Sequence, residues 1–503
     1  MGTTQSHIAQ FCATEQGAHR FLQRATFGAR PGDVSHLRAV GPDKWFDEQF
    51  SAPRGDRHLD IMMSSDAQRL QYAVWRHALT GKDLLRRRVG YALSQIFVVS
   101  DQAVNSNEVA AFADLLETHA FGDFRQLIEA VTLSPAMSRY LSLQRSAREG
   151  ASKGSSPDEN YAREIMQLFT IGLWELKSDG TRRLSGGEPI PTYDLDDVMG
   201  LARAFTGWIL PTAPLPERYG IRLAPREPVD RWHESGEKRF LGLTIPAGTS
   251  IDETLRLTLD HLSAHPNVGP FIGRQLIQRL VTSNPSPSYV QRVAQTFHDD
   301  GTGRRGNLGA VVMAVLTDIE AVSPPDPAVF GKLREPALRF TVIARALGIS
   351  STDPVWRIGR LDNAATAIGQ QPYYSSSVFN FYSPSYTPPS TELDSRRLVA
   401  PEMEIVTAAS TIGWINWLSG FLNRQPTGIS LDLTGLMGLS SPPALVDEVV
   451  RRLCPGGLAA PTRERIIAAV SAITNRVPST QQRERALSAV LLTAATTDFL
   501  IEH

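Results

Sequence analysis

Cysteine is nearly absent from this sequence, and neither sign of charge is in excess. Only Cys12 and Cys454 occur among the 503 residues, near opposite ends of the chain. Two distant cysteines argue against a disulfide framework and a cysteine metal site, so we expect two structural thiols. Lys and Arg total 51 against 52 Asp and Glu, which gives a formal net charge of −1. This balance is not that of a protein built to bind nucleic acid or an anionic membrane.

Long hydrophobic runs are also missing. The best candidates, Leu308–Leu316 and Ala486–Ala495, are shorter than the roughly 20 residues that cross a bilayer and are typical of core helices. The segment Met1–Gln16 has neither a basic start nor an apolar stretch, so it does not resemble a signal peptide. We expect no membrane span and a cytoplasmic location, unless a partner carries the folded chain across a membrane.

The common catalytic signatures are absent as well. The chain has no Gly-X-Ser-X-Gly sequence, phosphate-binding loop or zinc pattern. Gly301–Gly306 has the glycine spacing of a dinucleotide loop, but it joins two predicted helices instead of following a strand. His261 and His265 are four residues apart, yet Pro266 disfavours helical geometry at His265. The sequence therefore predicts no metal ligands and identifies no cofactor.

Apolar residues make up 42% of the chain, and most of them recur at helical spacing. We predict a mostly α fold: one large multi-helical domain with an irregular insert that contains short strands. Its parts are an N-terminal helical region (1–209), the insert (210–250) and a C-terminal helical region (251–503). The two helical regions are expected to form one compact unit. Within the proline-rich insert, Lys238–Ile245 alternates as short strands do.

Two local patterns outside the insert carry further predictions. Between Lys177 and Thr192, Asp179-Gly180 and Gly186-Gly187 are glycine-containing pairs that can hold a tight hairpin. Arg86, Arg87 and Arg88 point around most of a helical turn, so we expect them mainly to form ion pairs rather than one basic patch.

The most distinctive stretch is Pro157–Gly172, with the sequence PDENYAREIMQLFTIG. Its apolar residues predict the buried face of a helix, and Gly172 predicts the end of that helix. Four polar residues fall together on a neighbouring face: Asn160, Arg163, Glu164 and Gln167. Such a stripe is either a solvated surface or the wall of a site.

Seven stretches share the order and spacing of a known family: Arg20–Gly28 (RFLQRATFG), Ala92–Ser100 (ALSQIFVVS), Pro157–Gly172, Tyr193–Trp208 (YDLDDVMGLARAFTGW), His265–Val281 (HPNVGPFIGRQLIQRLV), Gly331–Arg339 (GKLREPALR) and Ser377–Pro384 (SVFNFYSP). Through them, nearly the whole chain resembles the domain-of-unknown-function 1800 family of bacterial proteins. The resemblance implies a largely helical protein. It also implies a gene beside that of a domain-of-unknown-function 1501 protein, which is similar to the alkaline phosphatase/sulfatase superfamily and often exported. It implies no particular activity.

Three residues are the acid–base candidates: Glu164, Asp197 and His233. Glu164 lies on the polar stripe, where the alternative is an ion pair with an arginine or plain solvation. Asp197 follows Asp194 at the start of the predicted helix Leu195–Trp208, where an acidic residue can cap the helix, bind a hard cation or act as a general base. His233 lies in a loop beside two carboxylates, and it suits acid–base work near neutral pH or the satisfaction of loop carbonyls.

Six residues are the candidates for substrate binding: Asn160, Arg163, Gln167, Arg274, Gln278 and Asn380. On the predicted helix Asn267–Val281, long polar side chains can clamp a carboxylate, a sulfate or sugar hydroxyls. They can equally pair with acidic residues in the core. Asn380 shares its loop with several aromatic residues, which are typical of carbohydrate sites and also of minor cores.

These residues fit two functions, and the sequence does not decide whether the protein is an enzyme. The first is a hydrolase-like enzyme that acts on a carbohydrate or similar polymer through acidic residues in a helical cleft. The alternative is a non-catalytic helical partner or maturation factor for the sulfatase-like protein. Convergent carboxylates in an open pocket would favour the enzyme, and the same residues paired inside the core would favour the partner.

Overall fold

The structure is a computed structural model of the chain and describes residues 2–64, 69–151, 154–210, 225–326 and 328–502. Within these ranges the fold is mostly α, as predicted, with helices α1–α24 and only two-stranded antiparallel sheets. No helix of the described ranges is long and apolar enough to cross a membrane. Cys12 and Cys454 are both free and buried.

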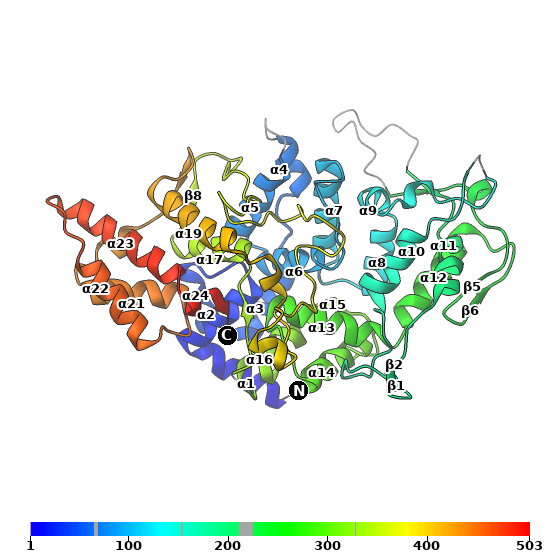
Figure 1. Cartoon of the computed structure of the whole chain (residues 1–503), viewed down its shortest axis with the longest axis horizontal. Helices are drawn as coiled ribbons and strands as arrows, with labels where there is room; N and C mark the ends of the chain where they lie inside the picture. The colour runs from blue at the N-terminus through cyan, green and yellow to red at the C-terminus, as the bar shows by residue number, and fades with distance from the viewer. Residues whose placement is uncertain (1, 65–68, 152–153, 211–224, 327, 503) are drawn as a thin grey trace.

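The N-terminal helices form much of the centre of the molecule (Figure 1). They are α1 (Gly2–Ala13), α2 (Glu15–Ala25), α3 (Pro31–Ser51), α4 (His58–Ser64), α5 (Leu70–Thr80), α6 (Leu84–Ser94), α7 (Ser106–Thr118), α8 (Phe124–Thr132) and α9 (Pro135–Tyr140). Thr14, Asn105 and Asp123 cap α2, α7 and α8, because each side chain accepts a backbone N–H of the first turn.

A second group of helices follows and builds the other half of the main core. It comprises α10 (Glu159–Glu164), the π-helix η2 (Ile165–Thr170), α11 (Leu195–Ala204), α12 (Ile251–Ala264), α13 (Val268–Leu280), α14 (Pro287–His298), α15 (Leu308–Thr317) and α16 (Ile319–Val322). The predicted helix at Pro157–Gly172 is present, but it widens into the π-helix after Glu164. Asp158 is its N-cap and Gly172, at φ 73°, follows its end.

The C-terminal helices extend to one end of the molecule, where α21–α23 lie together in Figure 1. They are α17 (Pro336–Ala346), α18 (Glu392–Ser395), α19 (Ala408–Asn423), α20 (Thr434–Met437), α21 (Pro442–Leu453), α22 (Ala460–Ser471), α23 (Pro478–Ala494) and α24 (Thr497–Leu500).

Every strand is short and pairs with one other strand. The pairs are β1 (Leu184–Ser185) with β2 (Glu188–Pro189), β3 (Trp208–Ile209) with β4 (Glu227–Pro228), β5 (Lys238–Phe240) with β6 (Leu243–Ile245), β7 (Lys332–Leu333) with β10 (Ile501–Glu502), and β8 (Ser350–Ser351) with β9 (Ile429–Ser430). Gly186 and Gly187 join β1 to β2 with φ of 60° and 92°, which confirms the predicted hairpin. The predicted strands at Lys238–Ile245 are also confirmed, whereas 211–224 of the predicted insert lie outside the described residues.

Two large hydrophobic cores and one small cluster hold the helices of the described ranges together. The main core takes buried side chains from Ile8 to Phe330, with Tyr373, so it spans both predicted helical regions and the insert. The second core is built mainly from Ala337–Phe499, and Trp75 and Leu79 of α5 reach into it. Helix α5 therefore contacts both cores and joins the C-terminal helices to the centre.

Candidate functional site

A cavity of about 580 Å³ lies against α13 and takes in Arg274 and Gln278, two of the predicted binding residues. We call it the α13 cavity. Its walls are the chain between Gly172 and Leu184, one face of α13 with the start of α14, and the loop residues Pro384 and Ser385. A volume of this size is within the range of small-ligand pockets.

Asn267 fixes the first wall to α13. Its Oδ1 accepts the backbone N–H of Leu176 at 2.9 Å, and its Nδ2 donates to the carbonyls of Ile171 and Trp174 at 2.9 and 2.8 Å. The residue is 2% exposed, so these backbone groups are satisfied away from water. One side chain at the start of α13 thus fixes the first part of this wall, as far as Leu176.

Two glycines allow this wall to approach α13 and α14. Gly172 has φ 73°, and a Cβ there would lie 2.8 Å from the ring of Phe271. Gly180 has φ 75°, and a Cβ there would lie 2.9 Å from Val290 Cγ1. Both positions need positive φ and the absence of a side chain, so glycine is required for the shape of the cavity.

Two exposed arginines line the α13 cavity, Arg182 and Arg274, and their guanidinium groups have no hydrogen bond or ion pair with any described residue. Arg182 lies over the ring of Trp174, 5.4 Å from its centroid. Desolvation by the surrounding protein, and then the positive charge of Arg182, lower the pKa of Arg274. The one acidic lining residue, Asp179, accepts hydrogen bonds from Thr181, and these lower its pKa. The cavity can therefore accommodate an anionic group.

Amide side chains complete the polar part of the cavity. Gln278 donates through Nε2 to the carbonyls of Ser283 and Pro384, at 3.0 and 3.1 Å, and so holds the loop wall in place. Gln275 is 7% exposed, and its Nε2 has no hydrogen-bond partner among the described residues. Gln278 is thus a positioning residue, and Gln275 retains an unused donor.

The predicted polar stripe of Asn160, Arg163, Glu164 and Gln167 lies on α10 and η2. None of its four residues lines the α13 cavity. Gln167 Oε1 accepts the hydroxyl of Tyr193 at 3.3 Å, and Arg163 pairs with Glu159 at 3.4 Å. Glu164 is 7% exposed and its Oε2 has no partner among the described residues. Burial raises the pKa of Glu164, although Arg163 opposes this effect. The exposed Asn160, the fourth member, donates from its Nδ2 to Ser142 Oγ at 3.3 Å.

Asp197 satisfies backbone groups. Its Oδ2 accepts the N–H of Asp194 at 3.1 Å while Asp194 accepts the N–H of Asp197, which forms a capping box. Its Oδ1 accepts the N–H of Leu241 at 2.5 Å and joins α11 to the β5–β6 turn. Asp194 is therefore the cap that the sequence predicts, and Asp197 supports it.

His233 is also held inside the protein. It is 5% exposed, its Nδ1 lies 2.9 Å from the carbonyl of Thr206, and its Nε2 lies 3.2 Å from Thr254 Oγ1. The carbonyl contact requires a proton on Nδ1. Burial lowers the pKa of His233 despite the Thr206 bond. These contacts join the chain around Thr206 to α12.

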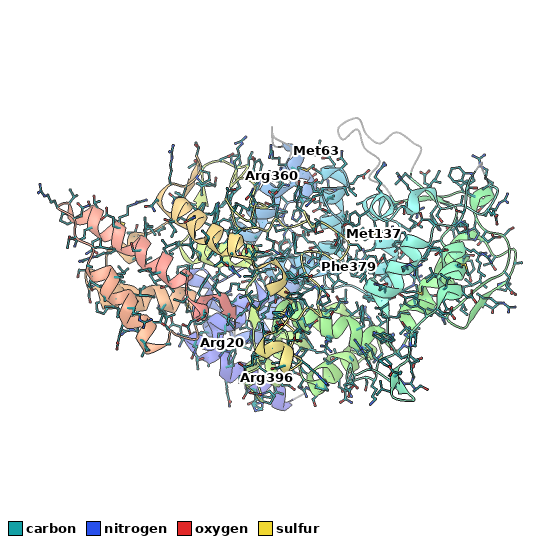
Figure 2. All side chains as sticks on the ribbon, in the orientation of Figure 1. Arg20, Met63, Met137, Arg360, Phe379 and Arg396 are labelled. Atoms are coloured by element: carbon teal, nitrogen blue, oxygen red, sulfur yellow. The ribbon has the colours of Figure 1, made fainter. Side chains whose placement is uncertain are left out.

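Asn380 lies in the loop that ends at the cavity wall, but it is turned into the protein. It is 7% exposed with φ 67°, and its Nδ2 has no partner among the described residues. The neighbouring Phe379, labelled near the middle of the molecule in Figure 2, is 54% exposed. The structure thus brings Arg274 and Gln278 to one cavity, while Asn380, Asp197 and His233 are not among the residues that line it.

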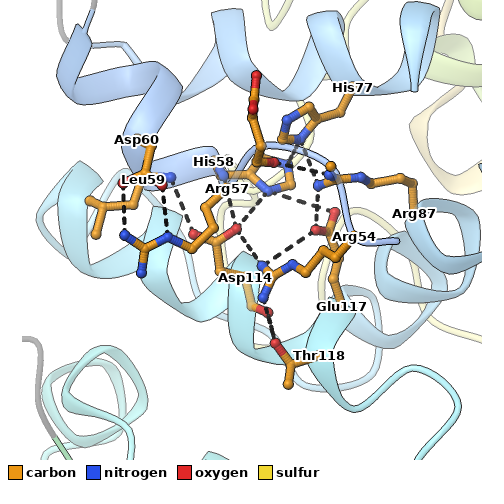
Figure 3. Close-up of polar contacts among 12 residues, drawn as sticks. Arg54, Arg57, His58, Leu59, Asp60, His77, Arg87, Asp114, Glu117 and Thr118 are labelled. Carbon is orange, nitrogen blue, oxygen red and sulfur yellow. Dashed lines mark hydrogen bonds and ion pairs between the residues drawn. The ribbon is translucent and has the colours of Figure 1, made fainter. Parts of the chain in front are cut away.

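One grouping in the described ranges has the donor set of a metal site: His58, His77 and Glu117, whose ligand atoms lie within 4.8 Å of one another. They come from α4, α5 and α7 and are all buried (Figure 3). However, Arg87 Nη1 lies 2.9 Å from His77 Nδ1 and donates to Glu117 Oε2. A guanidinium therefore already supplies positive charge at this place. Because the three residues are distant in sequence, no spacing rule could have found them.

The residues missed by sequence reasoning at the α13 cavity are Arg182, Trp174 and Asn267. Arg182 lies in the segment Lys177–Thr192, which was expected to be a loop with a hairpin, and Trp174 lies just before it; only the packing of this chain against α13 brings both to the cavity. Arg87 was expected to form ion pairs, and it does so with Asp83 and Glu117. Its neighbour Arg88 instead donates to the carbonyl of Arg279.

A family model described as a protein of unknown function (DUF1800) matches residues 20–501. Searches of curated proteins and of solved structures gave no match.

Proposed function

This chain belongs to the DUF1800 family, and we propose that it is a non-catalytic binding protein whose α13 cavity takes an acidic, partly apolar segment of a partner protein. The carrying observation is that Arg182 and Arg274, both exposed, line this cavity together and have no acidic partner among the described residues. Arginine in such a position binds carboxylates through paired hydrogen bonds. The family resemblance suggests a sulfatase-like DUF1501 protein as the partner.

Exposed apolar side chains around the cavity support a protein partner over a sugar. Leu173 and Leu184 line the cavity and are 48% and 58% exposed. Leu195 and Met199, 57% and 39% exposed, are four residues apart on α11 and so share one face. The chain leading into α11 is joined to the cavity wall, because Thr192 N–H donates to the Leu173 carbonyl at 3.1 Å. Clusters of exposed leucine and methionine are typical of protein-binding surfaces.

The acidic residues support a binding role over hydrolysis. A glycosidase needs two carboxyl groups about 5–10 Å apart beside the scissile bond. Asp179 is the one carboxylate that lines the α13 cavity, and it is hydrogen-bonded within its own turn. Other carboxylates are paired in the interior, as in Glu402 with Lys332 and Glu117 with Arg87.

Co-purification with the sulfatase-like neighbour tests the proposal. The double substitution R182A/R274A is expected to weaken the complex at least about 100-fold, because it removes two charge-assisted bonds of about 1.5–3 kcal/mol each. R183A is the matched control, since Arg183 is the next residue of the same hairpin and pairs with Glu175 at 3.0 Å. Equal binding by the double variant and wild type would overturn the proposed site. A neighbour that is stable and active without this chain would refute the maturation role.

Glu164 favours a second candidate, hydrolysis of a carbohydrate or similar polymer. It has a buried carboxyl oxygen without a partner in the described ranges and a raised pKa, as a general acid requires. Gln167 and Tyr193 lie beside it for substrate contact. A panel of polysaccharides, incubated with wild type and Glu164→Gln, should give products only with wild type. Equal product from both would remove Glu164 from the mechanism.

A further inference from the structure

A second cavity, of about 450 Å³, lies between α7, α8 and α9, which pack against one another (Figure 1). We call it the α7–α8 cavity. Its lining residues on α7 are three or four positions apart and therefore share one face of the helix. They are Glu108, Ala111, Phe112, Leu115 and His119. None of the described residues that line this cavity also lines the α13 cavity, and its volume is within the range of small-ligand pockets.

Most of the described lining of the α7–α8 cavity is apolar. Besides the α7 residues, α8, the start of α9 and the chain between them contribute Ala130, Leu133, Pro135 and Ala136. Phe112 and Ala136 are both 1% exposed and belong to the main core. The cavity therefore reaches the core, and an apolar lining with a few polar groups is typical of small-molecule sites.

Glu108 is a buried carboxylate in this lining, with 2% of its surface exposed. It lies in the first turn of α7, where the helix dipole favours a negative charge. Its Oε1 accepts Arg139 Nε at 2.8 Å, and the side chain of Arg139 is 38% exposed. Its Oε2 is buried and has no hydrogen-bond partner among the described residues. Because a buried carboxylate oxygen without a donor is unfavourable, Glu108 can still accept a hydrogen bond from a ligand.

The other polar side chains of the described lining supply no positive charge. Glu129 is a second carboxylate, and it pairs with Arg125 of its own helix at 2.5 Å. Burial lowers the pKa of His119, so its ring is neutral near neutral pH. No lysine or arginine occurs among the described residues that line this cavity. Its charged lining residues are thus acidic, whereas two arginines line the α13 cavity.

The surface around the α7–α8 cavity favours a small molecule over a protein partner. The exposed large apolar side chains of the described ranges, such as Leu195 and Phe379, include none that lines this cavity. Clusters of such side chains are typical of protein-binding surfaces. Here the apolar side chains are buried or only partly exposed, as Leu115 and Leu133 are, so they suit a ligand that enters the cavity.

We propose that the α7–α8 cavity binds a small organic amine, whose ammonium group donates a hydrogen bond to Glu108 Oε2. The apolar body of the amine packs against Phe112 and the alanines of α7 and α8. Arg139 keeps its bond to Oε1 and holds the carboxylate in position. The bond between the ammonium and Glu108 is charge-assisted, and such bonds are stronger than those between neutral groups. This site is separate from the α13 cavity and does not depend on the function proposed for it.

Isothermal titration calorimetry of the full chain with two probes of the same shape tests the ligand class. Phenethylamine carries an ammonium group, and phenethyl alcohol is its neutral counterpart. The amine should bind at least about tenfold more tightly, because only the amine forms a charge-assisted bond. This comparison needs only the wild-type chain. Equal affinity for the two probes, or no measurable binding of the amine, would overturn the proposal.

Three variants test where the amine binds. Glu108→Gln keeps the shape of the side chain and removes its charge, so amine affinity should fall about tenfold while alcohol affinity stays the same. Glu253→Gln is the matched control, because Glu253 lies in the first turn of α12 and its side chain is 44% exposed. Ala130→Phe fills the cavity and should abolish the binding of both probes. Unchanged amine binding by Glu108→Gln or by Ala130→Phe would refute this site.

Discussion

Lys332 and Glu402 form an ion pair of 2.9 Å in which both side chains are buried, at 1% and 2% exposure. The same Lys332 Nζ donates to the carbonyls of Gln278 and Arg279, at 3.0 and 2.9 Å. These are carbonyls in the last turn of α13, where a cation is favourable. The pair therefore anchors the end of the helix that carries the candidate binding residues.

Removing one partner of this pair should be much worse than removing both. Lys332→Met leaves Glu402 buried without its cation, and we expect a loss of about 3–5 kcal/mol in the free energy of unfolding. The double variant K332M/E402L should recover at least half of this loss. Side-by-side urea unfolding measures both. If the double variant is as unstable as the sum of the two single variants, the pair is not coupled.

Asn267→Ala should destabilise the protein by about 2–4 kcal/mol, because three buried backbone groups lose their hydrogen-bond partner. The wall of the α13 cavity should also loosen, so binding of the partner should weaken together with stability. Asn160→Ala is the control on an exposed asparagine, with an expected change within about 0.5 kcal/mol. The thermal unfolding midpoints of the two variants measure this difference. Equal midpoints would mean that the hydrogen bonds of Asn267 to the cavity wall do not stabilise the protein.

Gly180→Ala and Gly186→Ala separate backbone strain from steric conflict. Both positions have positive φ, so each alanine costs about 1–2 kcal/mol. Only at Gly180 does the new Cβ meet a neighbour, Val290 Cγ1, whereas nothing lies within 4 Å of it at Gly186. Gly180→Ala should therefore be the less stable variant by about 1–3 kcal/mol. Equal unfolding midpoints for the two variants would mean that the Cβ added by Gly180→Ala does not clash with Val290 of α14.

His233 should make the protein less stable in acid. Its pKa is lowered in the folded state, so around its ordinary pKa of about 6.5 the unfolded chain binds the proton more readily. Its contribution to stability is fully present above about pH 6.5 and is lost as pH falls through the lowered folded value. His233→Gln should flatten stability against pH in this window, while His7→Gln should not. Parallel slopes for wild type and His233→Gln would contradict a buried neutral His233.

The sequence determined the local structure of this protein, because that structure depends on contacts between near neighbours. Helical spacing of apolar residues gave the mostly α fold, Asp194 was identifiable as a cap, and Gly186-Gly187 as a hairpin turn. The stripe of Asn160, Arg163, Glu164 and Gln167 was found because one helix carries it. The widening into a π-helix after Glu164 was not predicted, since the periodicity of the apolar residues does not indicate it.

Only the tertiary structure decided which distant residues meet. Arg182 and Arg274 share a cavity because the chain between Gly172 and Leu184 lies against α13, where Asn267 accepts the N–H of Leu176, and no spacing rule connects these positions. His58, His77 and Glu117 converge because α4, α5 and α7 pack together. Tertiary packing also turned His233 inward and gave Asp197 two backbone partners. Residue type sets what a side chain can do, but its partners and its burial set what it does.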